Sequence, residues 1–268
     1  MPMNKKVCED HLLPALSNLR MSLLIIVCAG VFAGCTSTPV VIDTESAADT
    51  DITQLYQRAA NSPRRTADDH ASDASRKPVE FLSFAQVLPG MQVLDVSAGG
   101  GNTSELLALV VGSSGRVYAQ NPAPRVQLEK RLTNQPQANL IPLVQPFEAI
   151  MPPAALPLDL ITINLSYHDI ANLPIDRFVM NRRLLAGLKR GGHLVVIDHA
   201  AVAGSGANHT KTLHRIDEAL VRAEFEQAGF KLESVSNYLR NPYDIHDKKS
   251  PGLDRMSDRF AMRFIKLD

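Results

Sequence analysis

The feature that most constrains the fold is a short apolar stretch, Met91–Val96, that leads directly into a run of small residues. The stretch contains Asp95, and the run Ser97–Gly101 contains three consecutive glycines before a helix-compatible segment, Thr103–Val111. Glycine lets a backbone approach a ligand closely, and the N–H groups at a helix N-terminus attract polar or anionic groups. A strand, a tight turn and a helix in this order predict a ligand-binding loop at the end of a buried strand.

Apolar and amphipathic segments alternate along the rest of the chain. We expect strands at 91–96, 115–120, 140–144, 158–165, 193–197, 231–238 and 259–266, and helices at 52–60, 103–111, 124–132, 176–188 and 217–228. Near-continuous apolar strands separated by helices are typical of a parallel sheet covered on both faces. The sequence therefore predicts an α/β fold with a mostly parallel sheet, closed by an antiparallel strand pair, whose ligands lie beyond the carboxyl ends of the strands.

The N-terminal segment has the composition of an export signal. Its apolar run, 23–33, is shorter than the ~20 residues that a membrane-spanning helix needs, and it ends in Phe32-Ala33-Gly34-Cys35. This ending resembles the lipobox of bacterial lipoproteins, in which the cysteine is lipidated. We therefore predict a signal peptide over 1–34, a lipid anchor on Cys35 and a location in the cell envelope facing the periplasm, at the outer membrane. A short buried helix is the alternative, and Met21 is an alternative start of translation.

All three cysteines, Cys8, Cys28 and Cys35, precede residue 36. The rest of the chain therefore has neither a thiol nucleophile nor thiolate metal ligands, which suits an oxidising compartment. The segment after Cys35 is rich in Thr, Ser, Ala and Asp, a composition typical of a flexible tether. We predict three parts, namely the signal peptide, a tether over 35–51 and one domain over 52–268.

The charge balance bears on the partners. The chain has 28 Lys and Arg residues against 28 Asp and Glu residues, so its net charge is zero. A chain without excess positive charge gives no reason to expect nucleic acid. Trp is absent, which disfavours a stacking platform for single strands. We expect a small-molecule substrate, a membrane reached through the lipid anchor and no nucleic acid, and the sequence indicates no oligomeric state.

The loop also carries a family resemblance. Val93-Leu94-Asp95, followed by Ser97, Gly99 and Gly101, resembles the first motif of class I S-adenosylmethionine-dependent methyltransferases, in which small residues alternate after an acidic one. The G-x-G-x-x-G fingerprint lacks its third glycine here, and no P-loop lysine follows. The order of elements over 78–268 resembles the same superfamily, and several short motifs resemble predicted bacterial methyltransferases that carry signal peptides. The resemblance implies a Rossmann-like, seven-stranded sheet with helices on both faces and S-adenosyl-L-methionine as cofactor.

The resemblance further implies a set of cofactor-binding residues at the strand ends: Asp95, Ser97, Gly99, Gly101, Asn121, Glu148 and Asn164. Ser97 replaces the usual glycine, and we expect it to fit with a negative φ. Asn121 replaces an acidic residue that binds the ribose hydroxyls, so we expect cofactor binding to weaken by about 1–2 kcal/mol. Glu148 is expected near the adenine. A tight turn that binds nothing is the alternative interpretation of the loop.

Polar residues follow the fourth and fifth predicted strands, where members of the superfamily place substrate-facing residues. The predicted catalytic set is Tyr167, His168, Asp169 and His199. His168 and Asp169 can act as a general base with its neighbour. Alternatively, Asp169 caps a turn and His168 is a solvated loop residue. The nearby histidines show no metal-ligand spacing, so we expect separate histidines and no metal site.

These observations predict an S-adenosylmethionine-dependent methyltransferase that acts on an oxygen or nitrogen of a small molecule, with His168 or His199 removing a proton. The alternative is an exported ligand-binding or envelope-associated protein on a degenerate methyltransferase scaffold. Ser97 and Asn121 favour that alternative because both weaken the expected site, and S-adenosylmethionine is made in the cytoplasm. A metal-dependent hydrolase that uses the histidines is a third hypothesis.

Overall fold

A computed structural model of the chain describes residues 44–152, 157–250 and 256–267. The predicted signal peptide and Cys35 lie outside the described residues. Within the described ranges, every helix is too short or too polar to span a membrane.

The folded unit comprises residues 43–268, and its first helix is α1 (Thr44–Ala60). This helix begins inside the segment that we predicted to be a tether, so the prediction for that boundary is corrected. Acidic side chains near a helix N-terminus and alanines within it favour helix over coil, and the segment 44–51 contains both.

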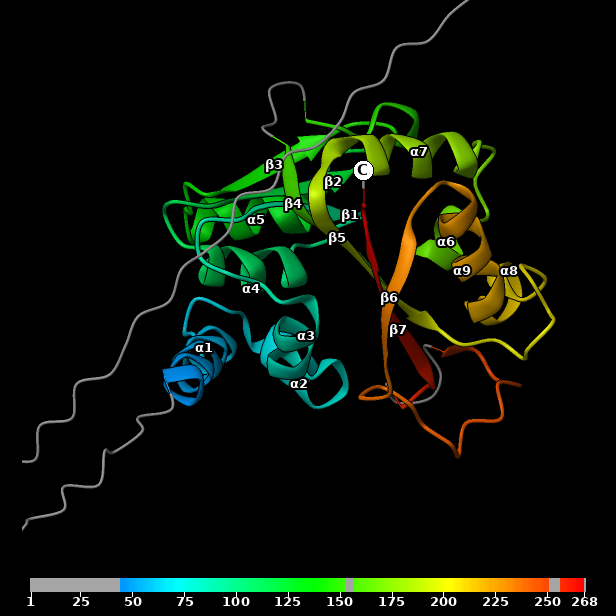
Figure 1. Cartoon of the computed structure of the whole chain (residues 1–268), viewed down its shortest axis with the longest axis horizontal. Helices are drawn as coiled ribbons and strands as arrows, with labels where there is room; N and C mark the ends of the chain where they lie inside the picture. Colours follow the sequence, from blue (N-terminus) through cyan, green and yellow to red (C-terminus); the bar gives the residue numbers. More distant parts are fainter. Residues whose placement is uncertain (1–43, 153–156, 251–255, 268) are drawn as a thin grey trace, which may run out of the picture. The chain divides into compact units, whose positions relative to one another are not determined.

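A seven-stranded sheet forms the centre of the folded unit (Figure 1). The strands are β1 (Gln92–Val96), β2 (Arg116–Asn121), β3 (Leu140–Val144), β4 (Leu158–Asn164), β5 (Leu188–His199), β6 (Lys231–Ser236) and β7 (Arg259–Ile265). Their order across the sheet is β3-β2-β1-β4-β5-β7-β6. The first five pair in parallel, whereas β7 runs antiparallel to both β5 and β6. The predicted mostly parallel, seven-stranded sheet is confirmed.

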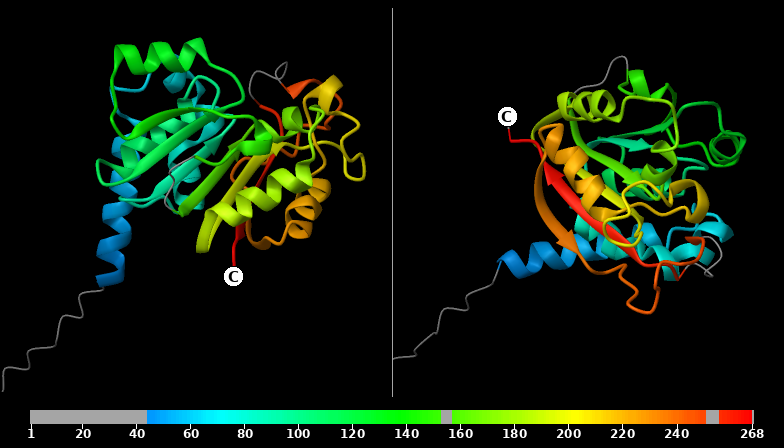
Figure 2. Two further views of the ribbon diagram at one scale, coloured as in Figure 1. Left: turned by 90° about the horizontal axis from the view of Figure 1, so that it is seen from above. Right: turned by 90° about the vertical axis from the view of Figure 1, so that its right-hand side faces the viewer.

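Helices cover both faces of this sheet (Figures 1 and 2). One face packs against α1, α3 (Pro78–Ala85), α4 (Asn102–Val111) and α5 (Val126–Asn134). The other packs against the short helices η1 (Phe147–Ala149) and α6 (Tyr167–Ile170) and the longer α7 (Arg177–Gly187) and α9 (Glu218–Gln227). The remaining helices are the polar α2 (Ala67–Arg76) and the single-turn α8 (Thr210–Leu213).

Neighbouring residues of the central strands pack into opposite cores. Leu94 belongs to the core with α7 and α9, and Val93 to the core with α3 and α4. Val196 and Val195 of β5 divide in the same way. Because successive side chains of a strand point to opposite faces, a strand covered on both sides is mostly apolar, and a polar side chain in it, such as Asp95, is hydrogen-bonded. This packing explains the continuous apolar runs in the sequence.

Glycine commonly follows the end of a helix, so we expected Gly191-Gly192 to end the predicted helix 176–188, and the structure corrects this expectation. The helix ends at Gly187, and both glycines lie within β5. Gly191 has a φ of +73°, and a Cβ on Gly192 would lie 2.9 Å from the carbonyl oxygen of Lys189. The pair therefore allows the backbone to bend closely at the start of β5, where the register with β4 also shifts.

Candidate active site

The loop Ser97–Gly101 connects β1 to α4 and is held by the end of β2. The backbone N–H of Ala98 donates to the carbonyl of Gln120 at 2.8 Å, and the N–H of Ser97 donates to the Gln120 side chain at 3.0 Å. Ser97 has a φ of +57°, in contrast to the negative value that we expected. Such a left-handed conformation costs an L-residue about 1–2 kcal/mol, and the bonds to Gln120 hold the loop in it.

The loop glycines serve different purposes. Gly99 lines a cavity, and a Cβ on it would meet no atom within 4 Å. A Cβ on Gly101 would instead lie 2.7 Å from a methyl carbon of Leu128 on α5. Gly99 therefore keeps the cavity open, whereas Gly101 allows α5 to pack closely and does not line the cavity.

Asp95 is buried at the base of the loop. Its carboxylate accepts hydrogen bonds from the hydroxyls of Ser104 at 2.5 Å and Thr162 at 2.8 Å. Burial raises the pKa of Asp95 to about 6, although both hydroxyl hydrogen bonds act in the opposite direction. Asp95 also lines the cavity, so it is the buried acidic group at the floor of the site.

Asn121 braces the loop. Its side-chain oxygen accepts a hydrogen bond from the N–H of Gly99 at 2.9 Å, and its amide nitrogen donates to the carbonyl of Gly99 at 3.3 Å. Asn121 is buried and does not line the cavity. The structure therefore corrects the expectation that this amide faces the ribose, because both of its polar atoms bind the backbone.

Arg131 of α5 fastens the loop to α2. It donates to the carbonyl of Gly100 at 2.8 Å, binds both oxygens of Asp69 at 2.7 and 2.9 Å, and pairs with the buried Glu105. Asp69 also closes a capping box with Thr66 at the start of α2. Although burial alone would raise it, the hydrogen bonds from Arg131 and Thr66 lower the pKa of Asp69. Sequence reasoning missed this clamp because Arg131 and Asp69 are 62 residues apart.

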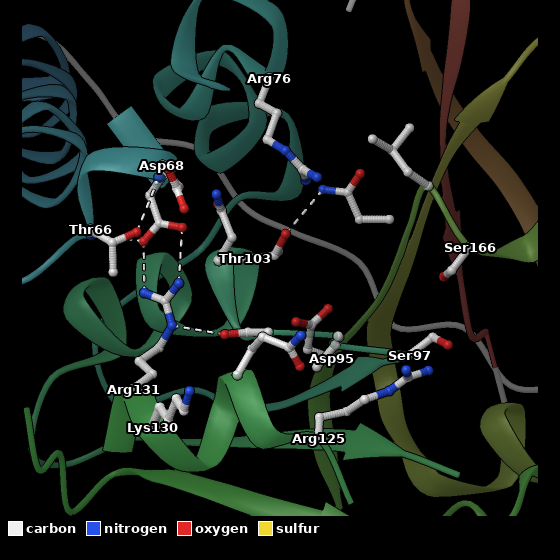
Figure 3. Close-up of a pocket in the computed structure, with 18 of the residues that line it drawn as sticks. Thr66, Asp68, Arg76, Asp95, Ser97, Thr103, Arg125, Lys130, Arg131 and Ser166 are labelled. Atoms are coloured by element: carbon white, nitrogen blue, oxygen red, sulfur yellow. Dashed lines mark hydrogen bonds and ion pairs between the residues drawn. The ribbon is translucent and has the colours of Figure 1, made fainter. Parts of the chain in front are cut away.

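The loop, α2 and α5 enclose a polar cavity of about 640 Å³ at the carboxyl ends of β1 and β4 (Figure 3). This volume lies in the range of small-molecule sites. In Figure 3, Arg131 and Lys130 project from α5 on one side, and Arg76 projects from α2. Of the predicted cofactor residues, those that line the cavity are Asp95, Ser97, Gly99 and Asn164. Glu148 is exposed in η1 and does not line it, so its expected place near the adenine is not supported.

A second cavity of about 370 Å³ adjoins the first. The two share five lining residues, Asp68, Asp69, Arg76, Asn102 and Leu165. The smaller cavity is also lined by His199, Ser257 and the buried Arg259. Burial and the positive charge of Arg76 lower the pKa of Arg259. The site thus has a larger part next to the glycine loop and a smaller part next to β5 and β7.

Tyr167 lies in the hydrophobic core and lines neither cavity. Its hydroxyl donates to Glu224 at 2.6 Å and accepts a hydrogen bond from Asn181 at 2.9 Å. Burial raises the pKa of Tyr167, and the neighbouring charge of Glu224 adds to the effect. The structure corrects the prediction of a catalytic Tyr167, because its polar atom is occupied on the side of α7 and α9.

The other predicted catalytic residues meet in one group, which we call the histidine cluster: His168, Asp169, Asp198, His199 and His214. The ring centroids of His168 and His199 are 5.7 Å apart, and those of His168 and His214 are 5.6 Å apart. His168 is buried, whereas Asp169 is exposed and lines the larger cavity. The interpretation of separate histidines is therefore wrong for these three.

Asp198 is the buried acidic residue that contacts both His168 and His199. It accepts hydrogen bonds from the backbone N–H of His168 and of His199, each at 2.8 Å, and its Oδ1 lies 2.7 Å from Nδ1 of His168. Although burial alone would lower it, the charge of Asp198 raises the pKa of His168. Burial, together with the nearby positive groups, lowers the pKa of His199 to about 3. His199 is therefore a neutral imidazole at physiological pH.

Comparison with known proteins identifies the family of this fold. The sequence model of the family described as Fibrillarin matches residues 72–240, which is more than half of the chain. The chain belongs to the fibrillarin family. A curated relative, the "Fibrillarin-like rRNA/tRNA 2'-O-methyltransferase" of Sulfolobus acidocaldarius, is 27% identical over 167 residues, which cover 62% of this chain and 67% of the relative.

Solved structures show the same fold at lower identity. A SAM dependent methyltransferase from Aquifex aeolicus gives a TM-score of 0.55 at 18% identity, covering 81% of this chain and 98% of that one. A putative sarcosine dimethylglycine methyltransferase from Galdieria sulphuraria gives 0.53 at 15% identity, covering 81% and 99%. Membership of the fibrillarin family, together with this fold, confirms the prediction of a class I S-adenosylmethionine-dependent methyltransferase.

The cavity fits the methyl donor of the fibrillarin family at the glycine loop. Gly99 leaves open space there, and Asp95, Ser97 and Asn164 supply polar groups around it. The end of β2 offers the donor no side-chain hydrogen bond from Asn121, because both polar atoms of that side chain bind the backbone of Gly99.

The fibrillarin relationship contradicts one prediction. We expected a small-molecule substrate and no nucleic acid, whereas the name of the curated relative specifies RNA. The prediction failed because it used only the net charge of the whole chain. That number carries no information about the distribution of charged residues over the surface. Two exposed basic residues, Arg125 and Lys130, line the larger cavity, whereas Arg131 beside them is paired with Asp69 and Glu105.

Proposed function

We propose that this methyltransferase modifies a ribose hydroxyl of RNA. The observation that carries the proposal is the pair of adjoining cavities, of about 640 and 370 Å³, beside a group of basic side chains on α5. Two joined cavities can hold a donor and an acceptor nucleotide side by side. The match to the fibrillarin family and the name of the curated relative support RNA as the acceptor.

The larger cavity is the proposed donor site. When bound there, S-adenosylmethionine supplies an electrophilic methyl group on a sulfonium. Gly99 leaves room for the nucleoside, and the carboxylate of Asp95 lies at the cavity floor. Asn164 is oriented by a 3.3 Å hydrogen bond to Thr103 at the start of α4. Asp95, Asn164 and Thr103 come from β1, β4 and α4, and Gly99 from the loop between β1 and α4, so their contribution is chiefly positioning.

The smaller cavity is the proposed acceptor site. Arg76 and Arg259 bring positive charge to it, which suits a phosphate next to the modified ribose. His199 lines the same cavity, and its ring is oriented by Ser257, whose Oγ lies 2.7 Å from Nδ1. A neutral imidazole can accept a hydrogen bond from a ribose hydroxyl.

Two exposed residues, Arg125 just before α5 and Lys130 within it, extend the proposed RNA-binding surface. Arg125 and Lys130 are both exposed and line the larger cavity. Exposed Arg and Lys side chains bind phosphates without reading sequence, and they release counterions on binding. These two residues therefore support affinity for RNA but not the choice of nucleotide.

Transfer to a hydroxyl also requires that its proton leaves. The new bond joins the methyl carbon to the ribose oxygen, the bond from that carbon to sulfur breaks, and the hydroxyl proton is released. The histidine cluster borders both cavities, because Asp169 lines the larger one and His199 lines the smaller one. We propose that the histidine cluster accepts this proton. His168, Asp169 and His199 therefore remain the proposed catalytic residues.

The test uses the purified full chain with tritiated S-adenosylmethionine and unmodified rRNA and tRNA transcripts. DNA of the same sequence is the matched control, because it lacks the 2'-hydroxyl. We expect label in RNA and not in DNA, with 2'-O-methylated nucleosides after digestion. Asp95→Ala should abolish cofactor binding in calorimetry. Label that enters both polymers equally, or cofactor binding without any labelled RNA, would contradict the proposal.

The N-terminal segment carries a separate proposal, which rests on sequence alone and competes with the first, because S-adenosylmethionine and RNA are both made in the cytoplasm. We propose that residues 1–34 are removed as a signal peptide and that Cys35 anchors the protein in the outer membrane, facing the periplasm. Cys35→Ser should release the protein from the membrane fraction. Unchanged fractionation of that variant would refute the anchor.

A further inference from the structure

Three members of the histidine cluster place potential metal ligands around one point. One ring nitrogen each from His168 and His214 and one carboxylate oxygen from Asp169 all lie within 4.8 Å of one another. Nε2 of His168 is 3.4 Å from Oδ1 of Asp169, and Nδ1 of His214 is 3.6 Å from the same oxygen. From this geometry we propose that His168, Asp169 and His214 bind a divalent transition-metal ion of the Zn²⁺ class.

The buried Asp198 supplies an independent argument. Nδ1 of His168 lies 2.7 Å from Oδ1 of Asp198, and in the tautomer that donates from Nδ1 to this carboxylate the lone pair of Nε2 is available to an ion on the side of Asp169. Metal-binding histidines commonly donate their second nitrogen to a carboxylate, which fixes the tautomer and strengthens the ligand. Asp198 is itself held by two backbone N–H groups and has a fully buried side chain. A solvated loop histidine would not need such a support.

The local backbone also holds the ligands in place. His168 and Asp169 are consecutive residues of α6, and His214 ends α8 with a φ of +52°. The side chain of His168 is 5% exposed and packs edge-on against the ring of His214. An ion would therefore add bonds to side chains that are already close together.

The ligand chemistry selects the class of ion. Two imidazoles and one carboxylate suit Zn²⁺, Co²⁺ or Fe²⁺, whereas Mg²⁺ and Ca²⁺ prefer sites built from oxygen alone. Three protein ligands leave at least one coordination position for a water or a substrate oxygen. The side chain of Asp169 is 60% exposed and lines the larger cavity, so that position is accessible from the cavity.

A bound ion would have a chemical consequence at this place. A divalent cation lowers the pKa of a hydroxyl that coordinates to it. The proton of an acceptor hydroxyl that reaches the ion from the smaller cavity would then leave more easily. This role rests on the proposed function, but the binding of the ion does not.

The test measures metal binding without cofactor or RNA. The full chain carries Cys8, Cys28 and Cys35 replaced by Ser, so that no thiolate competes for the ion, and it is stripped with a chelator. Titration calorimetry with Zn²⁺ should show one site, and Co²⁺ should give the visible absorption of a nitrogen- and oxygen-bound ion. Mg²⁺ should not compete. Bound Zn²⁺ should also raise the melting temperature.

The exposed Asp169 and the half-buried His214 provide the variants, because replacing the buried His168 risks unfolding. Asp169→Asn and His214→Asn should each weaken Zn²⁺ binding by about tenfold or more. His209→Asn is the matched control, since His209 lies nearby in sequence but outside the cluster. Equal affinity in the wild type, the two ligand variants and the control would overturn the site, as would the absence of Co²⁺ absorption. Intact metal binding in a protein without RNA methylation would instead count against the proposed function alone.

Discussion

The side chain of Asn121 exchanges two hydrogen bonds with the backbone of Gly99, accepting from its N–H at 2.9 Å and donating to its carbonyl at 3.3 Å. The end of β2 is therefore joined to the loop after β1 by one amide. An acidic side chain could accept from the N–H of Gly99 but could not donate to its carbonyl. The amide thus makes a loop contact that a carboxylate cannot replace.

This relationship predicts the effect of restoring a carboxylate. Asn121→Asp should lower the free energy of unfolding by about 1–3 kcal/mol, because the carbonyl of Gly99 loses its donor and faces a negative charge. It should not tighten cofactor binding, since position 121 does not line the cavity. Chemical denaturation and calorimetry check both expectations. Asn237→Asp, at an exposed position away from both cavities, is the control, and tighter binding in Asn121→Asp alone would show that the side chain reaches the ribose.

Asp95 should make the stability depend on pH. Its pKa rises from 3.8 to about 6 in the folded protein, so its contribution is greatest below pH 3.8 and is lost as the pH rises through about 6. The free energy of unfolding of the wild type, relative to Asp95→Asn, should fall by about 3 kcal/mol between pH 4 and pH 8. Urea denaturation of both proteins across this range measures the difference. A difference that does not change with pH, or that grows toward pH 8, contradicts the assignment.

Arg131 should be essential for stability, whereas the neighbouring Lys130 should contribute little to it. Arg131→Ala leaves Asp69 and the buried Glu105 without their partner, which should cost about 3–5 kcal/mol. Lys130→Ala should change the stability by less than about 0.5 kcal/mol. If Lys130 contacts a phosphate, its loss should reduce the slope of RNA affinity against salt by about one. Denaturation and binding titrations at several salt concentrations separate the two residues.

Tyr167 should contribute to stability and not to chemistry. Tyr167→Phe removes the hydroxyl that joins Glu224 and Asn181, which should cost about 1–3 kcal/mol. The rate of methyl transfer, measured well below the melting temperature, should stay within about twofold because the rate barrier is unaffected. A large loss of kcat with little change in melting temperature would return Tyr167 to the catalytic residues.

The fold was predictable because its signals are local. Each parallel strand has a continuous apolar run, and β3 has the bounds 140–144 that the sequence indicated. The error at Gly191 arose because glycine ends helices and also allows bends within strands. The early start of α1 was missed because the residues of 44–51 suit both a helix and a tether.

The site was predictable only in part, since several of its contacts join distant residues. Asp95 was recognised from its motif, but its partner Thr162 is 67 residues away. The clamp between Arg131 and Asp69 has no local signature. The histidine cluster was underestimated for the same reason, because His168 and His214 meet only through the packing of α6 and α8.

The smaller cavity draws on both ends of the folded unit. Asp68, Asp69, Ser257 and Arg259 line it, yet all four fall outside the stretch 72–240 that matches the fibrillarin family. Asp68 and Asp69 also line the larger cavity, whereas Ser257 and Arg259 line only the smaller of the two. Substitutions at Ser257 and Arg259 should therefore alter the proposed acceptor site while the inherited donor loop stays intact.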